Sequence, residues 1–367
     1  MAAKTRTEVS GRSRVDRLRL SFSTLGVDAF LVTHLPNVRY LCGFSGSAGV
    51  LLVETTRSTL FTDARYTLQA REEISDSRVE IAGQSLLKAS GEALRSRRKR
   101  MRVAFSPSQV TVVQRDALQI AGGGRVRWVD GGNAVEKLRA IKDSDELADM
   151  RAAAVLISDV FSKIIRMVKP GIAELQLAAE IEYSIKQKGA MGASFETIVA
   201  SGLRSAWPHA RATSKLLSKN ELVVLDQGAI LRGYCSDMTR TVFLGRSPTK
   251  LRRLYGAVLE AQEAAKAAIR PGVAAGDVDA AARRVLQRQG LGRYFTHSTG
   301  HGLGIEVHEM PRLGRNDNTK LEKGMVVTVE PGVYLEGTGG IRIEDDVLVT
   351  ATGCVDLTNA TREFLEL

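Results

Sequence analysis

Histidine is concentrated in one short segment of the chain. Of the five histidines, His297, His301 and His308 fall within the segment HSTGHGLGIEVHEMP, where glycines stand at positions 300, 302 and 304. A single histidine in a globular protein is usually a hydrogen-bonded structural residue, whereas three among small residues suggest metal ligands or proton carriers. Glycine also lets the backbone approach a neighbouring group closely, because it has no side chain. The segment therefore predicts a site where imidazole groups face a bound group.

An internal repeat links this segment to acidic residues. The segments KPGIAELQLAAEIEYSIKQKG, residues 169–189, and RPGVAAGDVDAAARRVLQRQG, residues 270–290, begin and end alike and have the same length. Each is followed by a histidine and two carboxylates, which pair as His209 with His308, Asp226 with Glu330, and Asp237 with Glu344. Each half therefore reads as helix, loop with histidine, strand with carboxylate and strand with carboxylate. Two halves related by a pseudo-twofold axis would bring the four carboxylates face to face, provided that their strands join in one curved sheet.

Such a cluster of carboxylates needs compensating positive charge. Asp226 follows the apolar run LVVL and Glu330 follows MVVTV, so both are predicted to be buried, while Asp237 and Glu344 taken alone could be turn or surface residues. Four converging carboxylates would repel one another unless cations neutralised them. Two divalent metal ions would supply that charge, and His301 would add a nitrogen ligand. An oxygen-rich site of this kind suits manganese (Mn2+), with zinc (Zn2+) or cobalt (Co2+) as alternatives.

As an ordered set, these residues and their motifs resemble the pita-bread metallopeptidases, and among them especially aminopeptidase P and prolidase, the Xaa-Pro aminopeptidases and dipeptidases. The motifs are SAWPHA, SDMTRT, HSTGHGLG, VHEMP, VEPGVY and GIRIEDD, while NVRYLCGFSGSAG and TDARYTLQA resemble the creatinase-type N-terminal domain of the same enzymes. The resemblance implies an α+β fold, in which a pita-bread catalytic domain with a pseudo-twofold repeat follows a smaller α/β domain. Creatinase shares this fold but not the metal ligands, so we expect a metallopeptidase.

The resemblance also implies a role for each candidate ligand. Asp226 would hold one metal ion, His301 and Glu330 would hold the other, and Asp237 and Glu344 would bridge the two. The ions would make an activated water available near neutral pH and polarise the scissile carbonyl. Glu330 would in addition act in catalysis by handling the proton.

Four further residues are expected around the metal ions. His209 and His308 would act in catalysis, as donors that stabilise the tetrahedral intermediate and help move a proton to the leaving nitrogen. His297 and Arg342 would bind substrate on the side that receives proline, although His297 could instead only orient His301 by a hydrogen bond. Arg342 could also pair with the carboxylate of a dipeptide. Our main hypothesis is therefore an Xaa-Pro aminopeptidase, with an Xaa-Pro dipeptidase as the alternative.

The elements that must position these residues fall into two domains. At 367 residues the chain is long enough for two cores. Short apolar runs such as DAFLVTH, AGVLLVE, STLFTD and RVAFS alternate with helical patterns over residues 14–135, which predicts the creatinase-type N-terminal domain. The catalytic domain is predicted over residues 136–367, with Asp143 or Ser144 as the cap of a long early helix. Residues 1–13 form a basic tail that we expect to be flexible.

The net charge of +11 raises the question of nucleic acid as a partner. Residues 1–137 carry 22 − 13 = +9 and the remainder carries 30 − 28 = +2, so the basic excess is N-terminal. Much of it lies in the tail and in RSRRKRMR, residues 95–102, which lacks the aromatic residues of a nucleic-acid motif and is typical of a solvated basic face. A non-catalytic pita-bread protein that binds an acidic or nucleic-acid partner is the alternative from another functional class.

The remaining expectations concern partners and location. The substrates are expected to be short peptides with proline second, and the protein is expected to form a homodimer. The N-terminus lacks the apolar run of a signal peptide, and no apolar stretch reaches membrane-spanning length, so we expect a cytoplasmic protein without a membrane partner. Three cysteines without a CxxC pair fit reduced thiols.

Overall fold

The computed structural model describes residues 13–83 and 85–367, so the expected tail lies outside the described residues apart from Ser13. The chain divides into two compact units, of which one ends at Arg139 and the other is Ala140–Leu367. Helix α7 (Ala134–Ala140) contains both this division and the boundary expected at residue 135. Among the described helices, none combines the length and the hydrophobicity that a membrane span requires.

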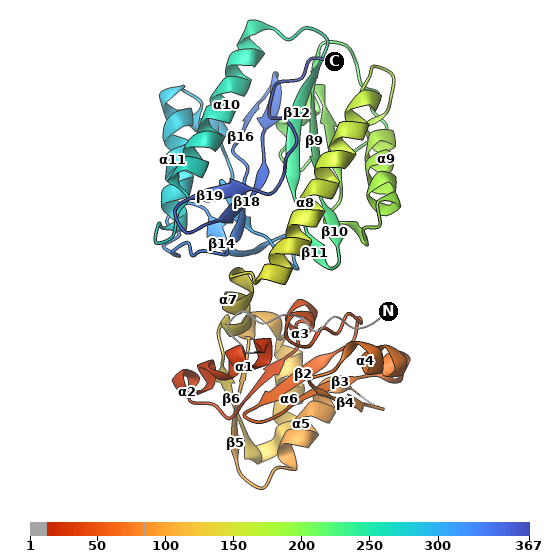
Figure 1. Cartoon of the computed structure of the whole chain (residues 1–367), viewed down its shortest axis with the longest axis vertical. Helices are drawn as coiled ribbons and strands as arrows, with labels where there is room; N and C mark the ends of the chain where they lie inside the picture. The colour runs from red at the N-terminus through yellow and green to blue at the C-terminus, as the bar shows by residue number, and fades with distance from the viewer. Residues whose placement is uncertain (1–12, 84) are drawn as a thin grey trace. The chain divides into compact units, whose positions relative to one another are not determined.

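The first unit is built on a six-stranded mixed sheet with helices around it (Figure 1). In spatial order its strands are β4 (Arg78–Ile81), β3 (Ser58–Thr62), β2 (Val50–Glu54), β1 (Ala29–Val32), β5 (Met101–Phe105) and β6 (Val126–Asp130). Its helices are α1 (Arg14–Arg19), α2 (Ser21–Leu25), α3 (Leu35–Cys42), α4 (Thr67–Glu73), α5 (Leu86–Arg95) and α6 (Val112–Gly122). The four apolar runs singled out in the sequence form β1, β2, β3 and β5, which confirms the predicted α/β character.

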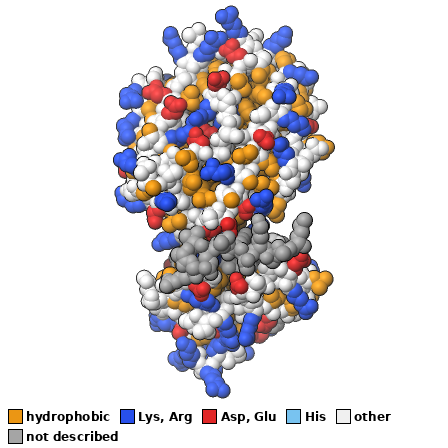
Figure 2. All heavy atoms as spheres, in the orientation of Figure 1, with side chains coloured by type: hydrophobic (Ala, Val, Ile, Leu, Met, Phe, Trp, Pro, Cys, Tyr) orange, Lys and Arg blue, Asp and Glu red, His pale blue; other side chains and the backbone are white. Residues whose placement is uncertain are grey.

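The basic run of residues 95–102 follows α5 and enters β5. Arg97 pairs with Glu54 at 3.0 Å and Lys99 pairs with Asp28 at 2.9 Å, so part of the run serves the fold of the first unit. Arg98 is exposed, as the solvated-face interpretation expects. On the face of the molecule seen in Figure 2, the Lys and Arg side chains of the second unit are interspersed with acidic and hydrophobic ones.

The second unit contains the repeat that the sequence predicts. Its first half comprises α8 (Ser144–Ile164), α9 (Glu174–Gln187), β7 (Gly192–Ala193), β8 (Ile198–Ser201), β9 (Glu221–Gln227), β10 (Ala229–Leu231), β11 (Tyr234–Cys235) and β12 (Met238–Leu244). The second half comprises α10 (Thr249–Ala268), α11 (Ala275–Arg288), β13 (Gly300–Gly302), β14 (Glu309–Leu313), β15 (Val326–Val329), β16 (Gly332–Leu335), β17 (Gly339–Arg342), β18 (Asp345–Val349) and β19 (Cys354–Asp356). The corresponding helices α9 and α11 both have 14 residues.

Each half has its own apolar core. Helices α8 and α9 pack on β8, β9 and β12 in one core, while α10 and α11 pack on β15 and β18 in the other. In Figure 1 the helices of the two halves lie on opposite sides of the strands. Asp143 caps α8 by accepting a hydrogen bond from the backbone of Glu146, as one of the two predicted caps. The helix pairs therefore cover the outside and leave the strands to carry the site.

The two halves meet at the beginning of β12 and β18. These two strands belong to different sheets, in the orders β12-β9-β8 and β14-β13-β15-β18-β19, and two small sheets, β11-β10-β7 and β16-β17, complete the unit, so the strands do not form one continuous ladder. The backbone N–H of Glu344 donates to the carbonyl of Thr239 at 3.1 Å, and the buried Arg240 pairs with Asp345 at 2.7 Å. These contacts join the sheets at the place where the predicted acids lie.

Candidate active site

Each half of the second unit places its two acids at facing ends of an antiparallel strand pair. Asp226 is near the end of β9, opposite Thr239 of β12, and Asp237 directly precedes β12. In the other half Glu330 directly follows β15, and Glu344 directly precedes β18. Since the end of one antiparallel strand lies beside the start of its partner, the two acids of each half come together. The hydrogen bonds between the halves then bring the two pairs together.

A cavity of about 740 Å³ opens at this junction. All of the residues that the sequence singled out for a site line it: His209, Asp226, Asp237, His297, His301, His308, Glu330, Arg342 and Glu344. The structure thus brings the whole predicted set to one place, and the role of each member stays a prediction.

The donors nearest to one another come from both halves. Asp237, His301 and Glu344 each offer one atom within 4.8 Å of the other two. His301 Nε2 lies 3.7 Å from Asp237 Oδ2 and 3.5 Å from Glu330 Oε1. His301 Nδ1 is 3.0 Å from the carbonyl of Gly302, and a proton on Nδ1 leaves Nε2 with the lone pair that a metal ligand needs.

The buried acids are strongly perturbed. Burial raises the pKa of Asp237 well above its usual value, and the charges of Glu344 and Asp226 raise it further. Burial likewise raises the pKa of Glu344, with Glu330 adding to the effect. The pKa of His301 is lowered by burial, which favours the neutral imidazole of a ligand.

Orphaned oxygens show that this donor set suits cations. Asp226 Oδ1 and Asp237 Oδ1 are both buried and have no hydrogen-bond partner. A buried carboxylate oxygen without a partner is costly, and a metal ion removes that cost. Four carboxylates and one imidazole therefore suit divalent metal ions.

Arg342 is held by groups on both halves of the unit. Its guanidinium donates to Asp226 Oδ2 at 2.6 Å and to Thr239 Oγ1 at 3.0 Å, and one of its nitrogens also donates to Tyr334 Oη at 2.7 Å. The same nitrogen donates to the carbonyl of Pro208 at 3.1 Å. Arg342 therefore neutralises part of the charge of Asp226 and lies beside the predicted ligands, and its contact with substrate stays a prediction.

His297 continues this chain of hydrogen bonds. Its Nδ1 lies 2.8 Å from the carbonyl of Ser298, and its Nε2 lies 2.9 Å from Tyr334 Oη. If Nδ1 donates to the carbonyl, Nε2 accepts the Tyr334 proton, and Tyr334 in turn accepts from Arg342. Burial raises the pKa of Tyr334 to about 12, so the phenol keeps its proton. The hydrogen bonds of His297 thus run to Ser298 and Tyr334 and not to His301.

The two symmetry-related histidines lie on the open side of the cavity. His209 follows the short helix Gly202–Ala206 and is exposed. His308 is also exposed, and its ring centroid is 4.4 Å from that of His301 with an angle of 69° between the rings. Burial lowers the pKa of His308, and a charge on His301 or His209 lowers it further. Both imidazoles line the cavity, and their contact with a substrate stays a prediction.

The glycines of the histidine segment allow the close packing that the sequence predicts. A side chain on Gly300 would collide with the carbonyl of Thr328, and one on Gly302 would collide with the carbonyl of Met310. A Cβ atom on Gly304 would lie 2.7 Å from the carboxylate of Glu309. At positions 300 and 302 any side chain would therefore force the backbone to shift, whereas at position 304 the Glu309 side chain would have to move.

Several cavity residues were not anticipated from the sequence. Arg312 of β14 stands directly opposite His301 of β13, so that both side chains project from the same face of the sheet. Its guanidinium has no ion pair with any described carboxylate, whereas Arg211 on the cavity rim pairs with Glu196 at 3.0 Å. The only signal for Arg312 was its position shortly after VHEMP, since its orientation depends on strand register.

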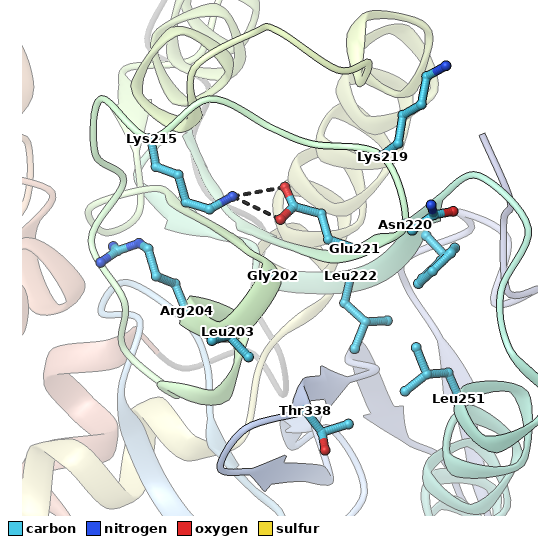
Figure 3. Close-up of a pocket in the computed structure, with 11 residues that line it drawn as sticks. Gly202, Leu203, Arg204, Lys215, Lys219, Asn220, Glu221, Leu222, Leu251 and Thr338 are labelled. Atoms are coloured by element: carbon cyan, nitrogen blue, oxygen red, sulfur yellow. Dashed lines mark hydrogen bonds and ion pairs between the residues drawn. The ribbon is translucent and has the colours of Figure 1, made fainter.

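A second hollow of about 400 Å³ lies at the start of β9 (Figure 3). Lys215 pairs there with Glu221 at 2.9 Å, and the wall includes Leu222 and Leu251. It contains none of the residues singled out for a site.

Comparisons with known proteins agree with this geometry. The model of metallopeptidase family M24 matches residues 148–351, and that of the creatinase/prolidase N-terminal domain matches residues 14–141. An Xaa-Pro dipeptidase of Pyrococcus horikoshii is 36% identical over 92% of this chain and 95% of its own length. The structure of an Xaa-Pro dipeptidase from Bacillus anthracis has a TM-score of 0.91 and 37% identity, covering 96% of this chain and 99% of its own. That of an X-Pro aminopeptidase from Thermotoga maritima has a TM-score of 0.89 and 34% identity, covering 97% and 100%.

Proposed function

The chain belongs to metallopeptidase family M24, with a creatinase-type N-terminal domain and a pita-bread catalytic domain, and from this premise we propose that it is a dinuclear-metal Xaa-Pro dipeptidase, a prolidase. Of the two activities left open by the sequence, the dipeptidase alternative is better supported than the main aminopeptidase hypothesis, because the similar proteins include more dipeptidases. Membership in a peptidase family leaves the non-catalytic binding protein without support.

The observation that carries the dipeptidase proposal is the free guanidinium of Arg312 beside the predicted metal ligands. In a dipeptide the carboxylate lies two bonds beyond the scissile nitrogen, whereas in a longer peptide that place is taken by a neutral amide. Arg312 lines the cavity next to His301 and has no acidic partner among the described residues. Arginine matches the geometry of a carboxylate with two parallel hydrogen bonds. Arg312 would therefore hold the carboxylate of a dipeptide and favour it over longer substrates.

The metal ions would be held by both halves of the unit. Asp226 would bind one ion, His301 and Glu330 the other, and Asp237 and Glu344 both, with manganese as the proposed metal. When bound, the ions supply activated water near neutral pH and polarise the scissile carbonyl. Thr239 donates to Glu344 Oε2 at 2.6 Å and so keeps one carboxylate oxygen oriented while the other stays available.

The chain's own residues would then perform the proton transfers. Glu330 lies 3.5 Å from His301 Nε2, and burial raises its pKa, so this carboxyl can take up a proton at a site where an ordinary glutamate would not. His308 and His209 would donate hydrogen bonds to the developing oxyanion and pass a proton to the proline nitrogen, which has none of its own. His297, held by Tyr334, would line the side that receives the proline ring.

A panel of four peptides tests the proposal. The manganese-loaded protein should hydrolyse Ala-Pro, leave Ala-Ala and Ala-Ala-Ala intact, and act on Ala-Pro-Ala far more slowly. Efficient cleavage of Ala-Pro-Ala would restore the aminopeptidase hypothesis. The similarity to an X-Pro aminopeptidase, at 34% identity, supports that hypothesis. Cleavage of Ala-Ala at the rate of Ala-Pro would refute the proline selectivity and leave the metal site untouched.

A further inference from the structure

The loop between His301 and His308 is closed by the carboxylate of Glu309. One carboxylate oxygen accepts a hydrogen bond from the backbone N–H of Glu306 at 3.0 Å. The carboxylate also lies against the backbone of Gly304, where a Cβ atom would be only 2.7 Å away. Because Glu309 directly follows His308, whatever fixes this carboxylate also fixes the backbone that carries His308.

The charge of Glu309 is balanced by a lysine from a distant part of the sequence. Lys142 Nζ lies 3.5 Å from Glu309 Oε2, and the two side chains are only 1% and 6% exposed. A buried ion pair is weak evidence for stability, because the cost of desolvating both charges offsets their attraction. In some proteins such a pair instead defines one arrangement among several, and Glu309 of this pair lines the cavity that holds the predicted ligands.

Lys142 is itself anchored to the strands that carry the metal ligands. Its backbone N–H donates to the carbonyl of Gly324 at 2.9 Å, and the preceding Ile141 forms an antiparallel bridge with Met325, just before β15. Strand β15 pairs with β13, on which His301 lies, and it ends one residue before Glu330. Through Lys142, the position of Glu309 is therefore fixed relative to β13 and β15, the strands that position His301 and Glu330.

We propose that the buried Lys142–Glu309 ion pair positions His308. The pair holds the His308 imidazole at its observed ring-to-ring distance of 4.4 Å from His301. The proposal rests on the proposed function, because the catalytic role of His308 belongs to it. Neither Lys142 nor Glu309 is assigned a contact with substrate. Their effect on the reaction passes through the loop of residues 302–309.

The test measures Lys142→Met and Glu309→Gln in two backgrounds, the wild type and His308→Ala, with manganese-loaded full-length protein. Glutamine keeps an oxygen that can accept from Glu306, and methionine fills the volume of the lysine chain, so that mainly charge is removed. In the wild-type background we expect kcat for Ala-Pro to fall by roughly 10- to 100-fold with little change in KM or metal content, as for a misplaced catalytic group. In the His308→Ala background the same substitutions should cost less than about twofold, because the group that they position is absent.

Hydrogen exchange provides a readout that is independent of activity. The amides of residues 303–309 should exchange faster in Lys142→Met than in the wild type. The matched control is Lys266→Met, which removes a partly buried lysine paired with Asp356 at 2.6 Å, neither of which lines the cavity, and should change neither kcat nor this segment. If Lys142→Met does not fold, the double variant Lys142→Met/Glu309→Gln, which removes both charges of the pair, is judged by the same two measurements.

The outcomes separate this inference from the proposed function. An equal loss of kcat in both backgrounds, or unchanged exchange over residues 303–309, would overturn the positioning role. A wild type that does not hydrolyse Ala-Pro would refute the proposed function, and the exchange measurement would then still decide whether the ion pair fixes the loop. If His308→Ala had normal turnover, the positioning role would fall together with the role of His308.

Discussion

Replacing Arg312 with methionine should selectively weaken the hydrolysis of dipeptides. A hydrogen bond to a charged group contributes about 1.5 to 3 kcal/mol, and each ~1.4 kcal/mol corresponds to a tenfold change in kcat/KM, so the possible loss spans roughly 10- to 150-fold. Arg312 is exposed, so water competes for its guanidinium and favours the lower end of this range. We therefore expect Arg312→Met to lower kcat/KM for Ala-Pro by about 10-fold.

The assay compares Ala-Pro with Ala-Pro amide, which presents the same scissile bond without the carboxylate. Arg312→Met should leave the slower hydrolysis of the amide within about twofold of wild type and should retain its metal. Arg211→Met is the matched control, because this cavity-rim arginine is already paired with Glu196 and should affect neither substrate. Equal losses on both substrates, or no loss on either, would show that Arg312 does not receive the carboxylate.

Three further predictions concern the metal site and its surroundings. Changing Asp237 or Glu344 to Ala should remove both metal ions and activity together, since each is proposed to bridge, and two retained metals with normal turnover, by elemental analysis and kinetics, would contradict this. Changing His209 or His308 to Ala should leave metal content intact and lower kcat by roughly 100-fold, and unchanged kinetics would remove the histidine concerned from the mechanism. The raised pKa values of Asp237 and Glu344 favour their protonated forms in the folded metal-free protein, so the stability that they contribute is present below the pKa of an unfolded carboxyl and is lost as the pH rises through the folded pKa. The rise in Tm on adding manganese should therefore be larger at pH 7.5 than at pH 5 and should be accompanied by proton release in calorimetry at the lower pH, and a rise independent of pH would argue against these carboxyls as ligands.

Much of the fold could be predicted from the sequence where burial leaves a pattern. The buried strands β1, β2, β3 and β5 of the first unit stand out as apolar runs, and the helix pair α9 and α11 as a repeat. The edge strands β4 and β6 were missed because an edge strand exposes much of its surface, as RVEI at residues 78–81 does, and leaves no hydrophobic run. The placement of β12 and β18 in separate sheets depends on contacts between the halves that no local pattern encodes.

In the site, too, the sequence spacing predicted which residues come together, whereas the partners of these residues depend on strand register and on contacts between the halves. The repeat alone brought Asp226, Asp237, Glu330 and Glu344 together with His209 and His308, because the two halves carry the same residue types in the same order at similar offsets of 99, 104 and 107 residues. The partners of these residues were not predictable. Arg342 bonds Asp226 across 116 positions of sequence, and the place of Arg312 opposite His301 follows from the pairing register of β13 and β14. The Arg342–Asp226 pair forms only when the two halves have folded against each other.

The most direct test of the central claim is a titration of the metal-free protein with manganese, in which bound metal and Ala-Pro hydrolysis are measured on the same samples. If the four carboxylates and His301 form a dinuclear catalytic site, hydrolysis will reach its maximum as two manganese ions bind per chain, and Glu344→Ala will bind neither ion tightly. Saturation of activity at one ion, or two bound ions without Ala-Pro hydrolysis, would contradict the account.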